Sequence, residues 1–426
     1  MSDAARGSTR EDPKPTLLAQ AQEVKDAARL IALASTAQKN EALIVCAGLL
    51  TASADRILEA NSLDISNARK AGTSETVIDR LMLNRSRIES MAVGLRDVAA
   101  LADPVGEIAQ GWVRPNGLNI RKVRVPLGVV GIIYENRPNV TSDAAALCLK
   151  SGNAAFLRGS SGAINSNTEI SSILSDGLVG VGLPAAAVTL VRDISRESAL
   201  EFMRLHGYID CLIPRGGPSL ISAIIESATV PYVIDGDGNC HIYVDESADL
   251  NMAVEIIANA KVQRPSVCNA VETILIHEKV AEQILPRLEL KMPSVELRAD
   301  PTSRRFLKRS TLATEMDYAT EFLDLILAVK TVSGLDEAID HIRRYGSGHS
   351  EAILTNDYLA SKRFILEVDA AAVLVNASTR FVDGGEVGYG AEIGISTQKL
   401  HARGPMGLRE LTTEKFVIEG NGQVRG

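Results

Sequence analysis

The stretch VPLGVVGIIYENRPNVTSDAAALCLKSGNAAFLRG, residues 125–159, predicts a strand, a helix and a second strand in succession. Its first part is rich in β-branched residues, which indicates a buried strand after a hairpin that begins near Asn116. TSDAAALCLKSG then has the pattern of a helix that ends at Gly152, and NAAFLRG has that of another strand. Two strands joined through a helix are typical of a parallel sheet, because parallel neighbours need a long crossover connection.

The same alternation of strands and helices continues along the chain. Further strands are predicted at 187–191 and 209–214, with helices at 166–182 and 198–207. A second series begins near His241, with strands at 241–245, 272–276, 325–329, 351–355 and 371–376 and helices at 251–262, 278–290 and 334–346. From Thr16 to about Val105, helical spacing of apolar residues predicts several amphipathic helices, broken at Asn61 and Gly72. The fold class is therefore α/β, with two doubly wound domains around a cleft.

Composition narrows the class of protein. A chain of 426 residues exceeds the usual size of one core, and a net charge of -8 leaves no basic field for nucleic acid. Five cysteines without a CxxC pair argue against a disulfide framework and structural zinc, and six scattered histidines predict no metal site. The polar segment 1–15, which we expect to be loose, has no signal-peptide pattern, and no apolar run could span a bilayer. We therefore expect a cytoplasmic protein without a membrane partner.

One of the five cysteines differs from the others. Four lie in or beside apolar segments, where cysteine usually behaves as a small hydrophobe: Cys46, Cys148, Cys211 and Cys240. Cys268 instead lies in QRPSVCNA, where Pro265 interrupts a helix. A helix N-terminus, Lys261 or Arg264 would lower the pKa of a thiol on this loop and so favour the nucleophilic thiolate. Spacing alone leaves a catalytic and a structural role equally open.

Two strand ends carry features of an anion-binding site. In LIPRGGPSL, Arg215, Gly216 and Gly217 lie between a buried strand and a helix. Glycines let the backbone approach a phosphate, and a helix N-terminus favours anions. An ordinary tight turn would look the same, since no GxGxxG fingerprint is present. Arg158 and two hydroxyl groups follow a second strand, at the end where ligands of open α/β sheets bind.

Several long motifs, in this order and spacing, resemble one family. They are VPLGVVGIIYENRPNVTSDAAALCLKSGNAAFLRG, DCLIPRGG, RPSVCNAVETILIH, EFLDLILAVK, VNASTRF and STQKLHARGPMGL. From roughly Ala21 to Val417 the chain is similar to the gamma-glutamyl phosphate reductases of the aldehyde dehydrogenase superfamily. The resemblance implies an aldehyde dehydrogenase-like fold and a homo-oligomer. It implies an NADP(H)-binding domain at 1–114 and 131–245, a catalytic domain at 246–405, and an oligomerisation hairpin and C-terminal strand at 115–130 and 406–426.

The resemblance also implies a reaction. This is the NADPH-dependent reduction of L-glutamyl 5-phosphate to L-glutamate 5-semialdehyde, the second step of proline biosynthesis from glutamate. Cys268 takes the position of the nucleophile that forms a thioester as phosphate leaves, and Asn139 takes that of the amide that holds the oxyanion. The resemblance starts too near the N-terminus to leave room for a fused kinase, so a separate glutamate kinase is expected as a transient partner.

Further residues are assigned through the same motifs. Glu321 matches the carboxylate that holds the nicotinamide ribose, and Arg215, Gly216 and Gly217 match the glycine turn near the nicotinamide. Arg158 replaces a lysine near the adenosine ribose, and Ser160 and Ser161 stand where NAD-preferring relatives often carry a glutamate, so NADP(H) is expected. The residues expected to bind the substrate are Arg137, Asn376, Ser378, Thr379, Arg380, Lys399, His401 and Arg403.

Asp235, in VIDGDGNCH, departs from the pattern of hydrolytic aldehyde dehydrogenases. Those enzymes use a glutamate to activate water against the thioester, and a carboxylate one methylene shorter reaches less far. We therefore expect the thioester to react with hydride or phosphate, while a role of Asp235 through a bridging water stays open. Two other functions also stay open. One is a hydrolytic or coenzyme A-acylating aldehyde dehydrogenase acting on another semialdehyde, and the other is a non-catalytic nucleotide-binding regulator.

Overall fold

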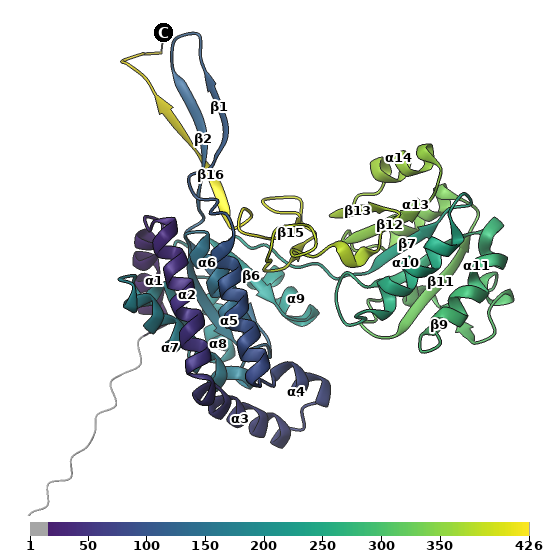
Figure 1. Cartoon of the computed structure of the whole chain (residues 1–426), viewed down its shortest axis with the longest axis horizontal. Helices are drawn as coiled ribbons and strands as arrows, with labels where there is room; N and C mark the ends of the chain where they lie inside the picture. The colour runs from purple at the N-terminus through teal and green to yellow at the C-terminus, as the bar shows by residue number, and fades with distance from the viewer. Residues whose placement is uncertain (1–15, 426) are drawn as a thin grey trace, which may run out of the picture.

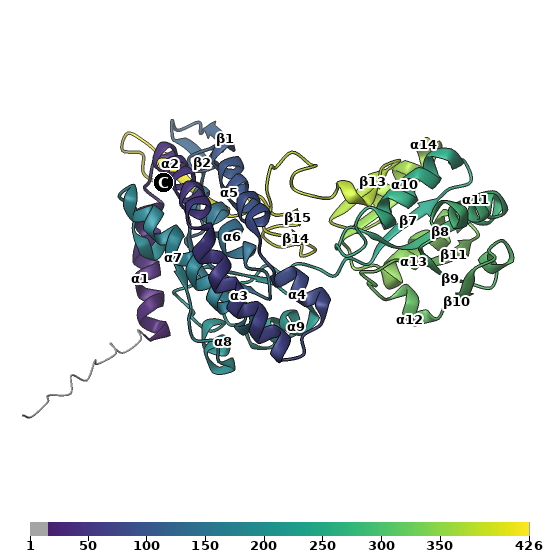
Figure 2. The ribbon, with the colours of Figure 1, turned by 60° about the horizontal axis from the view of Figure 1, so that its bottom comes forward.

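The computed structural model describes residues 16–425, and the expectation of a loose segment 1–15 lies outside them. The chain forms two α/β domains and a narrow three-stranded sheet that projects from the first domain (Figure 1, Figure 2). In no part of the described chain is a helix both long and apolar enough to cross a membrane.

The first domain begins with a layer of helices. They are α1 (Leu17–Ile31), α2 (Thr36–Ala52), α3 (Ala54–Lys70), α4 (Glu75–Leu81) and α5 (Arg85–Ala100). The predicted break at Gly72 is confirmed, and the residue has a φ of 71°. The predicted break at Asn61 is wrong, because this residue lies inside α3. Its buried side-chain amide donates to the Leu81 carbonyl (2.9 Å) and accepts from the Leu83 N–H (2.8 Å), which ties α3 to the end of α4.

The first sheet is parallel, as predicted, with the strand order β5-β4-β3-β6. Its strands are β3 (Val129–Tyr134), β4 (Ala154–Gly159), β5 (Val188–Leu190) and β6 (Cys211–Arg215). The helices that follow these strands are α6 (Asn139–Lys150), α7 (Ile164–Gly180), α8 (Arg196–Phe202) and α9 (Pro218–Ser227). From β3 the chain first builds outward to β5 and then returns to place β6 on the other side of β3. The strand order therefore reverses between β3 and β6.

The second sheet is also parallel, with the order β10-β9-β11-β8-β7-β12-β13. Its strands are β7 (Cys240–Val244), β8 (Val271–His277), β9 (Glu296–Ala299), β10 (Ser310–Leu312), β11 (Ile326–Val332), β12 (Ser350–Leu354) and β13 (Ala372–Val375). Its helices are α10 (Leu250–Val262), α11 (Glu278–Lys291), α12 (Glu315–Tyr318), α13 (Leu335–Tyr345) and α14 (Tyr358–Glu367). The sequence patterns predicted five of these strands and missed the short β9 and β10.

The division between the domains differs in two places from the ranges that we expected. Strand β7 pairs with β8 and β12, so it belongs to the second sheet although it falls within 131–245. Ile393 and Ala402 fall within 246–405 but are buried in the core of the first domain. Strands β14 (Ile395–Ser396) and β15 (Gly404–Pro405) lie in this returning segment. Hydrophobic patterns locate a strand or a buried residue but do not say which core receives it.

The projecting sheet consists of β1 (Ile108–Val113), β2 (Asn119–Pro126) and β16 (Thr412–Glu419). Strand β2 lies in the middle and pairs antiparallel with both neighbours. The predicted hairpin and the pairing of the C-terminal strand with it are confirmed, but the hairpin starts at Ile108 and not at 115. Its position beside the C-terminus is visible in Figure 1.

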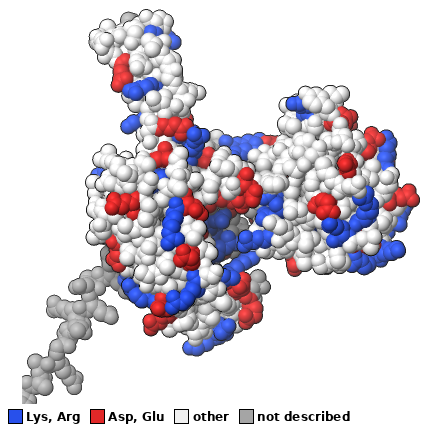
Figure 3. Space-filling view, viewed as in Figure 1, with Lys and Arg blue, Asp and Glu red and all other residues white. Residues whose placement is uncertain are grey.

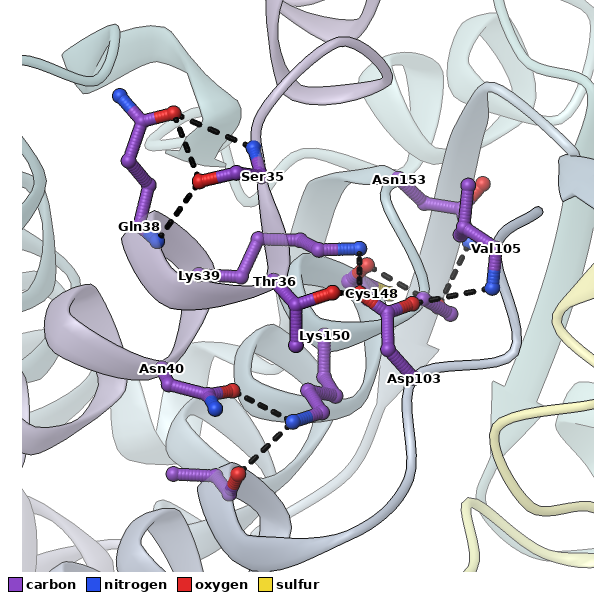
Figure 4. Close-up of polar contacts among 12 residues, drawn as sticks. Ser35, Thr36, Gln38, Lys39, Asn40, Asp103, Val105, Cys148, Lys150 and Asn153 are labelled. Atoms are coloured by element: carbon purple, nitrogen blue, oxygen red, sulfur yellow. Dashed lines mark hydrogen bonds and ion pairs between the residues drawn. The ribbon is translucent and has the colours of Figure 1, made fainter.

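Three charged side chains are buried around α2 and α6 (Figure 4). Lys39 Nζ lies 2.6 Å from Asp103 Oδ2, and the two side chains are only 2% and 7% exposed. Asp103 also accepts a hydrogen bond from Thr36 Oγ1 (2.7 Å). Lys150, at the end of α6, donates to the Ala99 carbonyl (2.8 Å). These contacts join the helical layer to the chain that leads into the projecting sheet.

Replacing Asp103 with asparagine should destabilise the first domain by roughly 3–5 kcal/mol, because Lys39 would stay buried without a counter-ion. Burial alone would raise the pKa of Asp103, but its contacts with Lys39 and Thr36 outweigh burial and lower it. The stabilisation is therefore fully present above the unfolded-state pKa and is lost as the pH falls through the lower folded-state pKa. Urea unfolding at several pH values, followed by circular dichroism, measures both effects.

The control for this prediction is Asp26→Asn, which removes an exposed ion pair with Arg29 (3.2 Å). This variant should lose less than about 1 kcal/mol, because solvent screens exposed pairs. Equal losses in the two variants would contradict the prediction.

Candidate active site

A cavity of about 530 Å³ lies between the two domains. One wall is formed where β3 and β6 end, by residues that include Glu135, Arg137 and Arg215, and the opposite wall is the loop that carries Cys268. The strand order of the first sheet reverses at this point, and ligands of open α/β sheets bind at such reversals. Figure 3 shows Lys and Arg atoms gathered in the hollow between the domains.

A close crossing of two chain segments fixes the backbone of Cys268. Its carbonyl oxygen lies only 1.7 Å from the position that a Cβ atom on residue 238 would take, so only glycine fits there. The Gly238 N–H donates to Glu321 Oε1 (2.9 Å). The Cys240 thiol donates to the same Cys268 carbonyl, with a distance of 3.1 Å from Sγ. The loop that carries Cys268 is therefore held by the segment of Gly238 and Cys240, and Glu321 in turn binds this segment.

The thiol of Cys268 is protonated at neutral pH in this arrangement. Burial, together with the nearby carboxylates of Asp235 and Glu321, raises its pKa to about 12, although Arg215 opposes the shift. The prediction that Lys261 or Arg264 would lower this pKa is wrong. Lys261 is fully buried and paired with Glu272 (2.6 Å), and the side chain of Arg264 is exposed. At neutral pH the thiolate is therefore only a minor species in this arrangement.

The carboxylates of the cavity differ in how they are held. Asp235 forms an ion pair with Arg215 and accepts a hydrogen bond from the Ile395 N–H (2.6 Å). Glu392 accepts a hydrogen bond from the Gly384 N–H (3.0 Å), and burial, with the charge of Asp383, raises its pKa to about 7. Sequence reasoning missed Glu392, because its segment GAEIG carries no spacing that indicates chemistry. Glu392 is able to gain and lose a proton near neutral pH beside the cavity.

Asn139 does not line the Cys268 cavity, although it lies close to it. As the first residue of α6 it lines a second cavity of about 450 Å³. Both cavities are bordered by Arg80, Arg137, Arg264, Ser266 and Val267. The side-chain amide of Asn139 donates to Asp143 Oδ2 (2.9 Å). In this arrangement the amide of Asn139 is directed to Asp143 and does not line the cavity of Cys268.

The residues expected to bind the cofactor divide into two groups. Gly216, Gly217, Arg215 and Glu321 line the Cys268 cavity, and a Cβ atom on residue 216 would lie 2.7 Å from Glu135 Oε2. The other group lies at the end of β4. Arg158 donates to the Ser195 carbonyl (2.7 Å), Ser160 Oγ donates to Asn136 Oδ1 (2.9 Å), and Ser161 begins a short 3₁₀ helix. Residues 16–425 contain no group of three or more metal-ligating side chains placed to hold a metal ion.

The family of the chain follows from comparison with known proteins. The family model described as "Aldehyde dehydrogenase family" matches residues 11–305. The chain belongs to the aldehyde dehydrogenase family. Its similarity to the crystal structure of gamma-glutamyl phosphate reductase from Thermotoga maritima has a TM-score of 0.94 at 50% identity and covers 96% of this chain and 100% of that chain. The expected aldehyde dehydrogenase-like fold is confirmed.

Two curated relatives extend this result. The gamma-glutamyl phosphate reductase of Caldanaerobacter subterraneus subsp. tengcongensis is 56% identical over 407 residues, which are 95% of this chain and 98% of that protein. The gamma-glutamyl phosphate reductase of Carboxydothermus hydrogenoformans is 57% identical over 408 residues, again 95% of this chain and 98% of that protein. Within the aldehyde dehydrogenase family the chain therefore groups with the gamma-glutamyl phosphate reductases, which are oxidoreductases.

In this family member, few of the expected substrate residues lie at the cysteine. Arg137 and Arg380 line its cavity, whereas Ser378 and Thr379 are buried beside it in the turn before Arg380. Asn376 is occupied in two hydrogen bonds with the backbone of Thr355 (2.8 and 2.9 Å).

Lys399, His401 and Arg403 lie outside the cavity altogether. Lys399 and Arg403 pair with Asp369, and His401 contacts the Glu410 carbonyl (2.7 Å). Their motif is continuous in sequence, but the chain turns away from the cavity after Ile395.

Replacing Asp235 with asparagine should accelerate alkylation of Cys268 by iodoacetamide at neutral pH. The substitution removes a negative charge near Sγ and leaves Arg215 unpaired, and both changes lower the pKa of the thiol. The rate should rise about tenfold for each unit by which the pKa falls. In the unmodified chain the rate should keep rising up to pH 10, because the pKa of Cys268 lies above that range. Rates measured from pH 6 to pH 10 test both statements.

The control for the alkylation experiment is Asp237→Asn. Asp237 lines the same cavity but is not among the main charges that act on the thiol. A rate that rises as much in this variant as in Asp235→Asn would contradict our account of the thiol.

Proposed function

We propose that this chain reduces L-glutamyl 5-phosphate to L-glutamate 5-semialdehyde with NADPH and releases phosphate, as the second step of proline synthesis from glutamate. The observation that carries the proposal is the charge around Cys268. Its cavity combines the thiol with Arg80, Arg137 and Arg264, which make no side-chain hydrogen bond or ion pair with any described residue. Unpaired guanidinium groups beside a nucleophile suit an acyl phosphate, since arginine binds phosphate in a bidentate manner.

The chemistry begins at the sulfur of Cys268. The thiolate attacks the acyl carbon, the C–O bond to phosphate breaks, and a thioester of Cys268 forms. The approaching phosphate and the arginines change the charges near Sγ, and a proton acceptor such as Glu392 can take the thiol proton because its pKa lies near 7. The Cys268 N–H and the Asn139 amide would hold the oxyanion, at roughly 3–4 kcal/mol per donor.

The state of Asp235 favours phosphate-linked chemistry over hydrolysis. A general base for water needs a carboxylate that is free to accept a proton. Here the Asp235 carboxylate is neutralised by Arg215 and bonded to the Ile395 N–H. Water beside the thioester therefore lacks an available base at this position.

The residues present fit a nicotinamide cofactor. When bound, NADPH supplies the hydride that reduces the thioester. The glycine turn at Gly216 and Gly217 borders the cavity at the start of α9, where the Gly217 N–H donates to Glu135 Oε2 (3.0 Å), and Glu321 lines the same cavity. Arg158 has a buried Nε without a partner among the described atoms, which leaves a donor for a 2′-phosphate. Another cavity, of about 940 Å³ at the end of β5, is lined by Asp193, which lies near Arg158, and offers room for the adenosine half.

The proposed reaction is tested most directly in reverse. Purified protein with L-glutamate 5-semialdehyde and NADP+ should form NADPH only when inorganic phosphate is present. Replacing Cys268 with alanine should lower the rate of this reaction at least about a thousandfold. NAD+ in place of NADP+ should give a lower kcat/KM. NADPH absorbance measures each rate.

Each other outcome favours another function. Turnover without phosphate would identify a hydrolytic dehydrogenase, and turnover that requires coenzyme A in place of phosphate would identify an acylating one. Binding of NADPH without turnover of any aldehyde would favour a nucleotide-binding regulator.

We also propose that the projecting sheet joins copies of the chain into a homo-oligomer. A three-stranded sheet without a packed face is marginal in water, and both of its outer strands have free edges. Trp112, Val113, Phe416 and Ile418 lie on this sheet and are between 39% and 69% exposed. Such a group of exposed apolar side chains usually marks an interface.

The double substitution Trp112→Glu with Phe416→Glu should therefore shift the protein to a smaller species, because it places charge in the proposed interface. The two rings contact each other edge to face at 6.4 Å, so both have to be changed. Size-exclusion chromatography with light scattering at micromolar concentration measures the mass. The control Leu290→Glu, at an exposed site on α11, should leave the mass unchanged. An unchanged mass in the double variant would exclude this sheet as the interface.

A further inference from the structure

The cavity that contains Asn139 holds a carboxylate without a cationic partner. Asp143, on α6, accepts hydrogen bonds from Asn139 Nδ2 (2.9 Å) and Ser142 Oγ (3.4 Å). No ion pair to it is found among residues 16–425. The second carboxylate of this cavity, Asp79, is already neutralised by Arg87 at 2.9 Å. A half-buried carboxylate that faces a cavity and lacks a counter-ion is suited to a cationic ligand.

The pKa of Asp143 is also consistent with a site for a cation. Burial raises the pKa of its carboxyl to about 6, although hydrogen bonds from Asn139 and Ser142 and the charge of Arg215, which forms no ion pair with it, oppose this shift. Near neutral pH the group is mostly ionised, yet its charge is poorly compensated. A cation beside it would favour the ionised form and lower the pKa again.

Positive charge lies where this cavity borders the cavity of Cys268. Arg80, Arg137 and Arg264 line both cavities and have no side-chain partner in the described chain. Burial and the charges of Arg215 and Arg80 lower the pKa of Arg137, which shows that these guanidinium groups repel one another. Anions placed among them would relieve this repulsion. The two cavities together therefore offer sites for anions near the nucleophile and for one cation further along α6.

We propose that the second cavity binds the α-amino acid head of the substrate, with Asp143 receiving the α-ammonium group and the arginines at its border receiving the α-carboxylate. This inference rests on the proposed function and assigns the substrate selectivity to one residue. L-glutamate 5-semialdehyde and its acyl phosphate carry an ammonium group, whereas 5-oxopentanoate has the same carbon chain without it. Asp143 therefore makes the enzyme select amino acid substrates over plain ω-oxo acids.

Asp143 also contacts Asn139, so the test has to separate recognition of the ammonium group from positioning of this amide. Asp143→Asn removes the charge but keeps an amide oxygen that can accept the hydrogen bond from Asn139. In the reverse reaction with NADP+ and phosphate, kcat/KM for L-glutamate 5-semialdehyde should fall about ten- to hundredfold, mainly through KM. The value for 5-oxopentanoate should change less than about threefold, because that substrate lacks the group that Asp143 binds.

The control is Asp79→Asn, at the exposed rim of the same cavity, which should keep the preference of the unmodified enzyme. A parallel loss with both substrates in Asp143→Asn would overturn the proposal, since it would show that Asp143 only positions Asn139.

A measurement on the unmodified protein does not depend on whether the variant folds. Free L-glutamate should slow the alkylation of Cys268 by iodoacetamide at concentrations at least about tenfold lower than glutarate, which lacks the ammonium group. Equal protection by the two compounds would overturn the proposal. If the unmodified enzyme oxidises neither aldehyde, the proposed function fails, and the protection experiment still decides what the second cavity recognises.

Discussion

Two chain segments cross at the active site so closely that the Cys268 carbonyl oxygen occupies the space that a side chain at position 238 would need. This contact fixes the position of the loop that carries Cys268. The same crossing directs the Gly238 N–H toward Glu321 and the Cys240 thiol toward the Cys268 carbonyl. A larger residue at 238 would displace the loop, and the cavity between the domains would lose the wall that carries the nucleophile.

Around this backbone, burial and the neighbouring charged groups set the pKa of the Cys268 thiol. Burial, with the charges of Asp235 and Glu321, keeps the thiol protonated, whereas Arg80, Arg137 and Arg264 on the same cavity have no side-chain partner among residues 16–425. Under the proposed function, the phosphate and carboxylate groups of the substrate would pair with these arginines.

Several features of this site could be predicted from the sequence, because each follows from a local pattern. The strand and helix after Asn116, the glycine turn at the end of β6 and the loop position of Cys268 all arise from residues close in the chain. Prediction failed where a long-range contact decides the outcome. Asn61 stays helical because its amide is satisfied from outside its own helix, and Lys399 leaves the site because Asp369, on another segment, pairs with it.

The sequence by itself determined the α/β class and the family resemblance, and through that resemblance it predicted Cys268 as the nucleophile, since periodicity, turn chemistry and ordered motifs depend on residues that follow one another in the chain. Only the tertiary structure decided the protonation of the Cys268 thiol, the exclusion of His401 and Lys399 from the cavity, and the position of Asp143 beside Asn139. The reason is physical. Burial and the distance between charges depend on residues far apart in sequence, and these quantities set the pKa of a group and the ligand that it can bind.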